Sequence, residues 1–224
     1  MKSVLITGGT VRLGRAITER LRAEGWRVIT SSHRADAGAD IVADLSEPMG
    51  AAKLYAAALQ ILGGMPPDAL VNNAALFTGD DAAIAAVNLE APKKLTTLMA
   101  GRETGVGAVV NILDSEVAGL RGCEVAGLRG CEVARLGTYL ASKRALLDFT
   151  RSAAATFAAT LRVNGVAPGP VMAPTDVHEK AGEMLLDRRP TADDVAAAVS
   201  YLLGAEATTG AVIPVDAGQN LLRA

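Results

Sequence analysis

Short runs of β-branched and apolar residues alternate with longer segments rich in alanine and leucine along this chain. The short runs have the length of buried strands, and the longer segments have the pattern of helices. Such alternation predicts right-handed crossovers and a parallel sheet with helices on both faces. We therefore expect an α/β fold, a doubly wound three-layer α/β/α sandwich. The predicted strands are residues 3–8, 27–32, 39–44, 68–74, 107–113, 161–169 and 210–218, and the predicted helices are residues 12–24, 48–62, 80–101, 138–160 and 191–204.

Composition limits the classes of protein to which the chain can belong. Half of the 224 residues are hydrophobic, 21% are charged and the net charge is −2, which suits one soluble domain over residues 1–224. No stretch approaches a membrane span and no signal peptide precedes the first strand, so we expect a cytoplasmic protein. The slightly acidic balance argues against a nucleic-acid partner. Two cysteines and two histidines are too few for a disulfide framework or a metal site.

Residues 116–136 contain a repeat. The octapeptide EVAGLRGC occupies residues 116–123 and again 124–131, and EVARL then begins a third copy. This period is too short for a solenoid. We expect a tandem duplication in a surface loop, because loops accept added length at little cost in free energy. A lid or a contact between subunits is the alternative.

The first predicted strand ends in TGGTVRLGRA, residues 7–16. In a strand–turn–helix unit, Gly8, Gly9 and Gly14 let backbone amides and a helix N-terminus face a pyrophosphate. Arg12 stands where the middle glycine of such a turn is usually found. The unit indicates a Rossmann-type fold that binds a dinucleotide.

The end of the second predicted strand indicates which dinucleotide. A site for NAD offers an acid to the ribose 2′-hydroxyl, but here the chain reads Ser-Ser-His-Arg over residues 31–34. A carboxylate would repel a 2′-phosphate, whereas an arginine binds it with a charge-assisted fork. Arg12 and Arg34 both lie at turns where the adenosine would sit, so we expect NADPH as the cofactor. Asp44, after the third strand, could accept from the adenine amino group.

A tyrosine and a lysine, Tyr139 and Lys143, have the i, i+4 spacing that puts two side chains on one face of a helix. A nearby ammonium favours the phenolate and lowers a tyrosine pKa, which makes the phenol a better proton donor near neutral pH. After five strands of a nucleotide-binding fold, this pair predicts a site for proton transfer.

Together these motifs resemble the short-chain dehydrogenase/reductase family over essentially the whole chain. The matching pieces are the turn of residues 7–14, Asn72-Asn73-Ala74, Asn88, the strand VVNIL, Tyr139 with Lys143, Pro168-Gly169 and the closing VDAG. Within the family, the chain is most similar to pteridine reductases and dihydromonapterin reductases. Four features carry that likeness: Arg12 in the cofactor turn, His33-Arg34 after the second strand, Asp114 in place of the usual serine, and the C-terminal GQNLLRA.

The resemblance implies roles for the residues of the reaction site. Tyr139 would be the proton donor, and Lys143 would bind the nicotinamide ribose and tune Tyr139. Asn88 would hold a water in the proton relay, and Asp114 would take the place of the serine near the substrate. A carboxyl group can accept from pterin N–H groups or, if burial raises its pKa, pass on a proton. The neighbouring Ser115 is the alternative for the serine role.

The resemblance also implies binding residues. Cofactor contacts are expected from Gly8, Thr10, Arg12, Leu13, Gly14, His33, Arg34, Asp44, Leu45, Asn73, Ala74, Tyr139, Lys143, Pro168, Gly169 and Val171. Phe77, with Asp114 and Tyr139, is expected at the substrate, because a flat heterocycle can stack on its ring. Residues 172–189 are the expected substrate loop. Related enzymes form tetramers, so we expect a homo-oligomer, tetramer or dimer, in which Arg223 either reaches a neighbouring site or belongs to a free terminus.

The function that the resemblance implies is the NADPH-dependent reduction of a small pteridine-like substrate, such as a dihydropterin or dihydrofolate. One alternative is an NADPH-dependent reductase of a carbonyl, either a 3-oxoacyl thioester or a small ketone, with Ser115 facing Tyr139. A nucleotide-binding sensor or scaffold without turnover is the alternative from another class. The repeat puts more residues between Asp114 and Tyr139 than the relatives have. If it loops out, the site survives; if it displaces the strand end, Asp114 loses its role.

Overall fold

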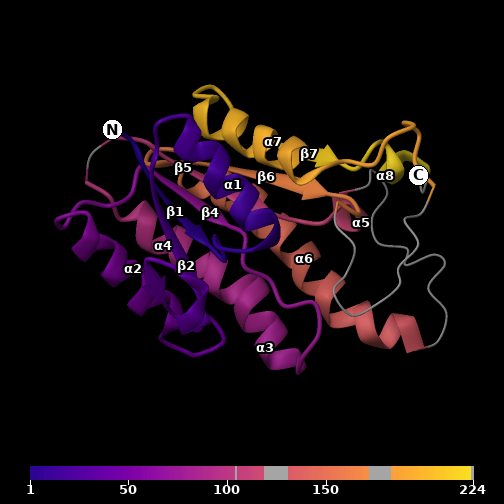
Figure 1. The fold of residues 1–224 in the computed structure, drawn as a ribbon, viewed down its shortest axis with the longest axis horizontal. Helices are drawn as coiled ribbons and strands as arrows, with labels where there is room; N and C mark the ends of the chain where they lie inside the picture. The colour runs from indigo at the N-terminus through magenta and orange to yellow at the C-terminus, as the bar shows by residue number, and fades with distance from the viewer. Residues whose placement is uncertain (104, 119–130, 172–182, 223–224) are drawn as a thin grey trace.

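The structure is a computed structural model that describes residues 1–103, 105–118, 131–171 and 183–222, and in this part of the chain seven parallel strands form one sheet (Figure 1). The strand order is β3-β2-β1-β4-β5-β6-β7. The strands are β1 (Ser3–Thr7), β2 (Arg27–Ser32), β3 (Ile41–Val42), β4 (Ala69–Asn72), β5 (Gly107–Ile112), β6 (Leu161–Pro168) and β7 (Val212–Val215). The expected doubly wound α/β fold is confirmed.

The order of the strands reverses beside β1. This strand pairs with β2 on one side, with Ser3 opposite Arg27, and with β4 on the other, with Val4 opposite Ala69. In open parallel sheets, the loops diverge at such a reversal and leave a crevice at the carboxyl ends of the strands. Residues that directly follow β1, β4 and β5 therefore meet at one edge.

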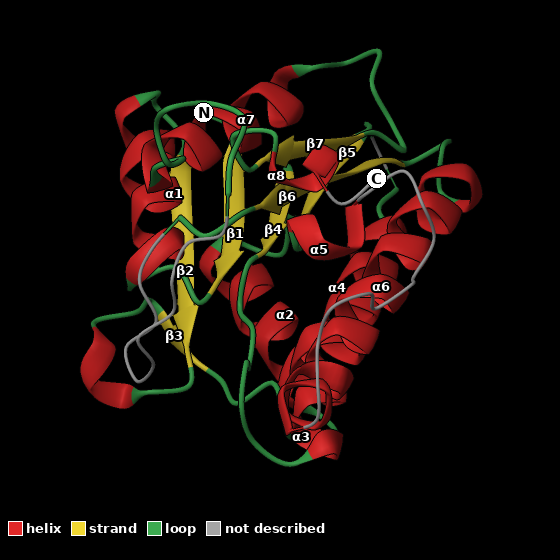
Figure 2. Ribbon diagram, turned by 90° about the vertical axis from the view of Figure 1, so that its right-hand side faces the viewer, coloured by secondary structure: helices red, strands yellow, loops and turns green. Residues whose placement is uncertain are grey.

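Helices cover both faces of the sheet (Figures 1 and 2). One buried apolar cluster joins the sheet to α1 and α7, and a second joins it to α2, α4 and α6. The helical elements are α1 (Arg12–Ala23), η1 (Ala35–Ala37), α2 (Gly50–Ile61), α3 (Asp81–Ala85), η2 (Ala86–Glu90), α4 (Ala91–Ala100), α5 (Ser115–Ala118), α6 (Cys131–Thr156), α7 (Ala192–Gly204) and α8 (Gln219–Leu222). The sheet's central strands are thus shielded from solvent on both sides.

Two helical predictions differ from the structure. The predicted helix over residues 80–101 is interrupted by η2, a π-helical turn. Residues 116–136 were expected to form a surface loop, but their ends are helical: α5 occupies Ser115–Ala118, and α6 begins at Cys131 rather than at residue 138. The last copy of the repeat thus continues into α6, and residues 119–130 lie outside the described residues.

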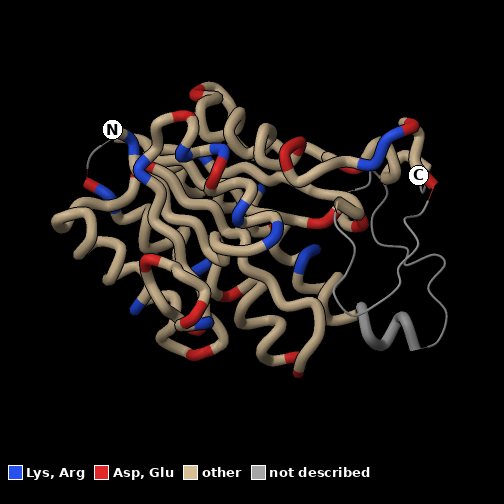
Figure 3. Tube along the Cα trace, in the orientation of Figure 1, with Lys and Arg blue, Asp and Glu red and all other residues tan. Residues whose placement is uncertain are grey.

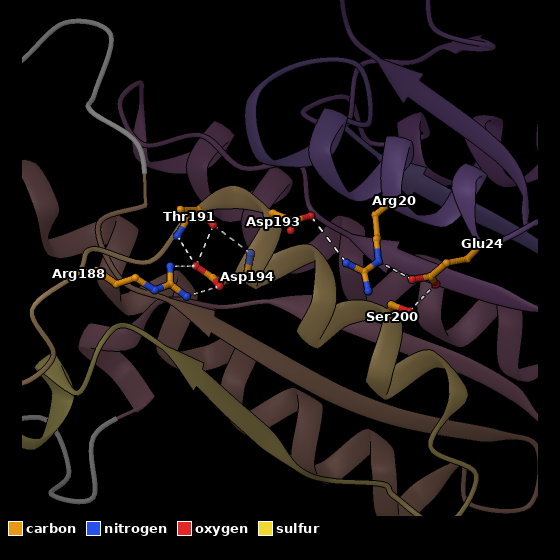
Figure 4. Close-up of polar contacts among 7 residues, drawn as sticks. All are labelled: Arg20, Glu24, Arg188, Thr191, Asp193, Asp194 and Ser200. Atoms are coloured by element: carbon orange, nitrogen blue, oxygen red, sulfur yellow. Dashed lines mark hydrogen bonds and ion pairs between the residues drawn. The ribbon is translucent and has the colours of Figure 1, made fainter.

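Helix α7 has the predicted start. Thr191 is its N-cap and forms a capping box with Asp194, in which each side chain accepts from the other residue's backbone amide. Arg188 donates to both carboxylate oxygens of Asp194, at 2.7 Å each (Figure 4). These hydrogen bonds hold the pKa of Asp194 far below its usual range. The end of the predicted substrate loop is therefore attached to α7, whereas residues 172–182 lie outside the described part of the chain.

Candidate active site

The turn after β1 is fastened to the turn after β4. The Thr7 hydroxyl accepts from the backbone amides of Asn73 and Ala74, at 2.9 and 3.0 Å. In return, the side-chain amide of Asn73 donates to the carbonyls of Thr7 and Gly8, at 2.9 and 3.0 Å. The Asn73 side chain, expected among the cofactor contacts, therefore acts on the glycine turn itself.

Packing explains the glycines of this turn. Gly8 has a φ of +62°, and a Cβ on Gly14 would lie 2.0 Å from the Gly8 carbonyl oxygen. Arg12, at the position where a glycine is usual, has a φ of 50°. A residue with a Cβ adopts this left-handed conformation at a cost of about 1–2 kcal/mol. The chain therefore keeps the backbone of a glycine turn while it places a guanidinium at the start of α1.

The start of α1 suits an anion. Its N-cap, Val11, offers no side-chain hydrogen bond, and no acidic residue lies in the first turn. The Thr10 hydroxyl is buried without a hydrogen-bond partner among the described residues. Backbone amides at a helix N-terminus, together with an unsatisfied buried hydroxyl, fit the phosphates of a dinucleotide.

The loop after β2 carries the predicted His33 and Arg34, both exposed. Arg34 donates from Nε and Nη2 to the two carboxylate oxygens of Asp36, at 3.0 and 2.7 Å. These hydrogen bonds lower the pKa of Asp36 and raise that of Arg34. The sequence reasoning missed Asp36, although an acid two positions after Arg34 is the signal that could have revealed the pair.

The other residues predicted to bind the cofactor differ in their burial and in their hydrogen-bond partners. Asp44 accepts from the backbone amide and hydroxyl of Ser46 with one oxygen, which lowers its pKa. The Leu45 side chain is buried in the apolar core. Leu13 and Val171 are half-buried against the other core cluster. Pro168 ends β6, and the Gly169 amide donates to the carbonyl of Val215.

Tyr139 and Asp114 meet across the repeat. The Tyr139 hydroxyl donates to Asp114 Oδ2 at 2.9 Å, and the other oxygen of Asp114 accepts from the amide of Glu116 at 2.9 Å. Asp114 is the second residue after β5, and Tyr139 is a buried residue of α6. Ser115 is also buried, at the first position of α5. The added residues leave the contact intact, and the hydroxyl of Tyr139 is bonded to the carboxylate of Asp114.

Lys143 is buried beneath this pair. Its Nζ donates to the Ile112 carbonyl oxygen at 2.8 Å and lies 5.8 Å from the centre of the Tyr139 ring. Burial lowers the pKa of Lys143 to about 8, and the Asp114 carboxylate partly opposes that shift. The structure thus brings together a phenol, a carboxylate and a lysine whose pKa is lowered to about 8.

Asn88 lies in the π-helical turn and is fully buried. Its Oδ1 accepts from the Leu76 amide at 2.8 Å, and its Nδ2 donates to the Leu76 carbonyl and to the Ser142 hydroxyl, at 2.9 and 3.1 Å. Both hydrogens of the side-chain amide are therefore used. The Asn88 side chain joins the segment after β4 to α6, and its role in a proton relay stays a prediction.

Phe77 lies over the reaction site. Its ring centre is 4.8 Å from that of Tyr139, with an angle of 58° between the planes, and its side chain is exposed. This is the tilted arrangement that aromatic pairs favour. Phe77 therefore presents ring surface to solvent directly beside the phenol.

A series of buried side-chain hydrogen bonds was not predicted from the sequence. Asn72 donates to Asn111 at 2.8 Å, Asn111 donates to Thr150 at 2.9 Å, and Thr150 donates to the Leu146 carbonyl at 2.7 Å. All three side chains are buried. The series connects β4 and β5 to α6, and it thereby fixes the helix of Tyr139 against the sheet.

Three further features concern only the residues that the structure describes. No group of three or more histidine, cysteine or acidic residues could hold a metal there. No helix in the same ranges has the length and apolarity to cross a membrane. Basic and acidic residues are interspersed along the described trace (Figure 3). Arg223, which was considered for a neighbouring site, lies outside this part.

Known proteins resemble this chain in sequence and in fold. The family model for short chain dehydrogenases matches residues 2–185. FolM alternative dihydrofolate reductase 1 from Brucella canis, solved with NADP, is 31% identical with a TM-score of 0.81, over 98% of this chain and 94% of that one. The NADP-dependent (R)-specific alcohol dehydrogenase of Lentilactobacillus kefiri is 29% identical over 97% of this chain and 96% of its own. Pteridine reductase 1 of Leishmania tarentolae is 28% identical over 98% and 96%.

The family match covers most of the chain, and the relatives extend over nearly all of it. Their enzymatic activities agree with the phenol, carboxylate and lysine found at the sheet edge. An oxidoreductase that uses a nicotinamide cofactor accounts for both the glycine turn and this cluster. The chain belongs to the short-chain dehydrogenase family.

Proposed function

We propose that the protein is an NADPH-dependent reductase of a pteridine-like substrate, a dihydropterin or a dihydrofolate. The observation that carries this proposal is the hydrogen bond from the Tyr139 hydroxyl to Asp114 Oδ2. It puts a carboxylate where most members of the family have a serine hydroxyl. The likeness to a dihydrofolate reductase and to a pteridine reductase supports the same substrate class.

Asp114 favours a substrate that carries N–H donors. An ionised carboxylate only accepts hydrogen bonds, whereas a serine hydroxyl both donates and accepts. A pterin ring offers N–H groups to such an acceptor, while a carbonyl oxygen would be repelled by it. The exposed ring of Phe77, next to Tyr139, adds a surface on which a flat heterocycle can stack.

Tyr139 and Lys143 divide the work of proton delivery, and Asn88 supports the helix that carries them. When bound, the reduced nicotinamide supplies a hydride to the carbon of a C=N bond. Tyr139 then supplies the proton that the nitrogen requires, directly or through water, and Lys143 stabilises the phenolate that remains. Lys143 would also hold the nicotinamide ribose, and Asn88 keeps α6 in register with the segment after β4.

The substrate class is tested by comparing NADPH oxidation with dihydrobiopterin, dihydrofolate and an acetoacetyl thioester. We expect kcat/KM to favour the two pteridines. Asp114→Ser should lower kcat/KM for the pteridines by roughly 10- to 100-fold, because a hydrogen bond to a charged group contributes about 1.5–3 kcal/mol. The same variant should leave the thioester reaction unchanged or make it faster.

Asp148→Ser is the matched control, because Asp148 is an exposed acid on α6 away from the site. A wild-type protein that prefers the thioester would contradict the pteridine proposal. That outcome would favour a carbonyl reductase, for which the likeness to an alcohol dehydrogenase is the supporting observation.

The choice of NADPH over NADH is proposed on Arg34 and Arg12, which lie at the turns where the adenosine would sit. Arg34 would exchange its hydrogen bonds with Asp36 for hydrogen bonds with the 2′-phosphate. Arg34→Ala should raise the Kd for NADPH by about 10- to 100-fold, since it removes charge-assisted hydrogen bonds, and should change the Kd for NADH less than about threefold. Titration of nicotinamide fluorescence measures both constants. Arg151→Ala, an exposed arginine on α6, is the control. Tighter binding of NADH by the wild type would contradict the proposal.

A further inference from the structure

The helical turn that carries Tyr139 is held from one side by the segment that follows β4, residues 76–90. We propose that the hydrogen bond between Thr138 and Asp81 is a positioning contact for Tyr139: it fixes the orientation of the phenol at the point where the repeat-derived part of α6 passes into the site. This inference rests on the proposed function, because the position of Tyr139 affects the reaction rate only if the phenol donates the proton.

The contact lies one residue before Tyr139. The Thr138 hydroxyl donates to Asp81 Oδ1 at 2.7 Å, a short hydrogen bond with a charged acceptor. Asp81 is the first residue of α3, and the preceding Asp80 caps that helix by accepting from the Ala83 amide at 2.9 Å. The acceptor therefore stands on a fixed backbone, which lets it define where Thr138 lies.

Gly137 explains why α6 needs such a contact. It lies inside the helix, immediately before Thr138, and a Cβ there would meet no atom within 4 Å. A glycine inside a helix weakens it by roughly 0.5–1 kcal/mol relative to alanine. The Asp81 contact ties the turn of Tyr139, which follows this weak point, to α3.

Two more contacts connect the same segment with the same turn. Asn88 donates to the Ser142 hydroxyl at 3.1 Å, and that hydroxyl donates to the Tyr139 carbonyl at 2.6 Å. The ring of Phe77 lies against the ring of Tyr139. Ser142 contacts the backbone of Tyr139, and Phe77 contacts its ring. Thr138 is the contact on the N-terminal side of Tyr139, toward the repeat. Loss of that contact should misplace the phenol by a fraction of an ångström without unfolding the helix.

The test compares variants that remove the hydrogen bond with variants that keep it. Thr138→Val has the same shape without the hydroxyl, and Asp81→Ala removes the acceptor. Both should lower kcat by about 5- to 20-fold with the KM of the substrate and the Kd of NADPH within twofold, since a misplacement of about 1 Å can cost on the order of 100-fold and a smaller one costs less. Thr138→Ser and Asp81→Asn retain donor and acceptor and should keep kcat within about twofold. The double variant Asp81→Ala/Thr138→Val should be no slower than either single one.

A second measurement does not depend on turnover. Tetranitromethane nitrates accessible tyrosines, and mass spectrometry separates Tyr139, which is buried, from Tyr201, which is exposed. We expect nitration of Tyr139 relative to Tyr201 to rise in Thr138→Val and to stay at the wild-type level in Thr138→Ser. Thr97→Val, which removes a hydroxyl bonded within α4, controls for the loss of a surface threonine and should change neither quantity.

The outcomes separate this inference from the proposed function. Wild-type protein that oxidises NADPH with none of the test substrates would overturn the proposed function, and the nitration ratio would still test the position of Tyr139. Equal kcat and equal nitration in Thr138→Val and wild type would overturn the positioning role. An equal loss of kcat in Thr138→Ser and Thr138→Val would overturn it as well, because the hydroxyl would then not be the cause.

Discussion

Replacing Tyr139 with phenylalanine is expected to lower kcat by roughly 10²- to 10⁴-fold, the range that a positioned proton donor contributes. The ring, its contact with Phe77 and the burial of the side chain all persist in this variant, so its shape is kept. What disappears is the hydroxyl that donates to Asp114 at 2.9 Å. Because the glycine turn lies at other residues, the Kd for NADPH should stay within about threefold of the wild type.

The stability of the Tyr139→Phe variant separates a chemical from a structural defect. Asp114 loses one donor but keeps the amide of Glu116, so the free energy of unfolding should fall by about 1 kcal/mol or less. Tyr201→Phe makes the same chemical change on an exposed residue of α7 and should alter neither kcat nor stability. Full activity in Tyr139→Phe would show that another group delivers the proton.

The fold could be predicted because the central strands are buried and largely apolar. The central strands β1, β4 and β5 are fully buried, so their sequences read as continuous apolar runs, and each lies within its predicted range. The short edge strand β3 was predicted too long, since only Ile41 and Val42 pair with β2. Asp40, just before β3, is bonded to Thr30 of β2 through its side chain, and local pattern alone does not show where the pairing of the backbones stops.

The sequence indicated individual residues of the candidate site but not the hydrogen bonds between them. The glycines of the turn and the Tyr139–Lys143 spacing are local signals. Their place among the predicted strands and helices indicated their function. Which of Asp114 and Ser115 meets Tyr139 depends on how the chain returns after the repeat, and no local signal encodes that return. The contacts of Asp81 with Thr138 and of Asn88 with Ser142 likewise join segments far apart in the sequence.

The second large effect concerns Lys143, whose burial opposes folding while its ammonium serves the reaction. Lys143→Met should lower kcat by at least about 100-fold, because the phenolate left on Tyr139 loses its cation. The same change should raise the free energy of unfolding at pH 7. A pKa lowered from 10.5 to about 8 by burial corresponds to a cost on the order of 3 kcal/mol for the buried ammonium. Loss of the hydrogen bond to the Ile112 carbonyl removes about 1 kcal/mol of that gain.

The pH dependence identifies the cause of the higher free energy of unfolding expected for Lys143→Met. Below a pH of about 8, Lys143 is protonated in both the folded and the unfolded protein, so the burial cost is fully present. Between pH 8 and 10.5 the folded state has lost the proton that the unfolded state keeps, so wild-type stability rises with pH. Above that window both states are neutral and the cost is gone.

Urea unfolding of the two proteins without cofactor, from pH 7 to pH 10.5, measures the difference directly. We expect Lys143→Met to be more stable by about 1–2 kcal/mol at pH 7 and the advantage to vanish, or change sign, by the upper end. Lys93→Met, at a half-exposed lysine paired with Glu90, should change stability by less than about 0.5 kcal/mol at every pH. A Lys143→Met protein that is less stable than wild type at pH 7 would mean that the ammonium is a net structural contact. In that case Lys143 would stabilise the fold as well as serve catalysis.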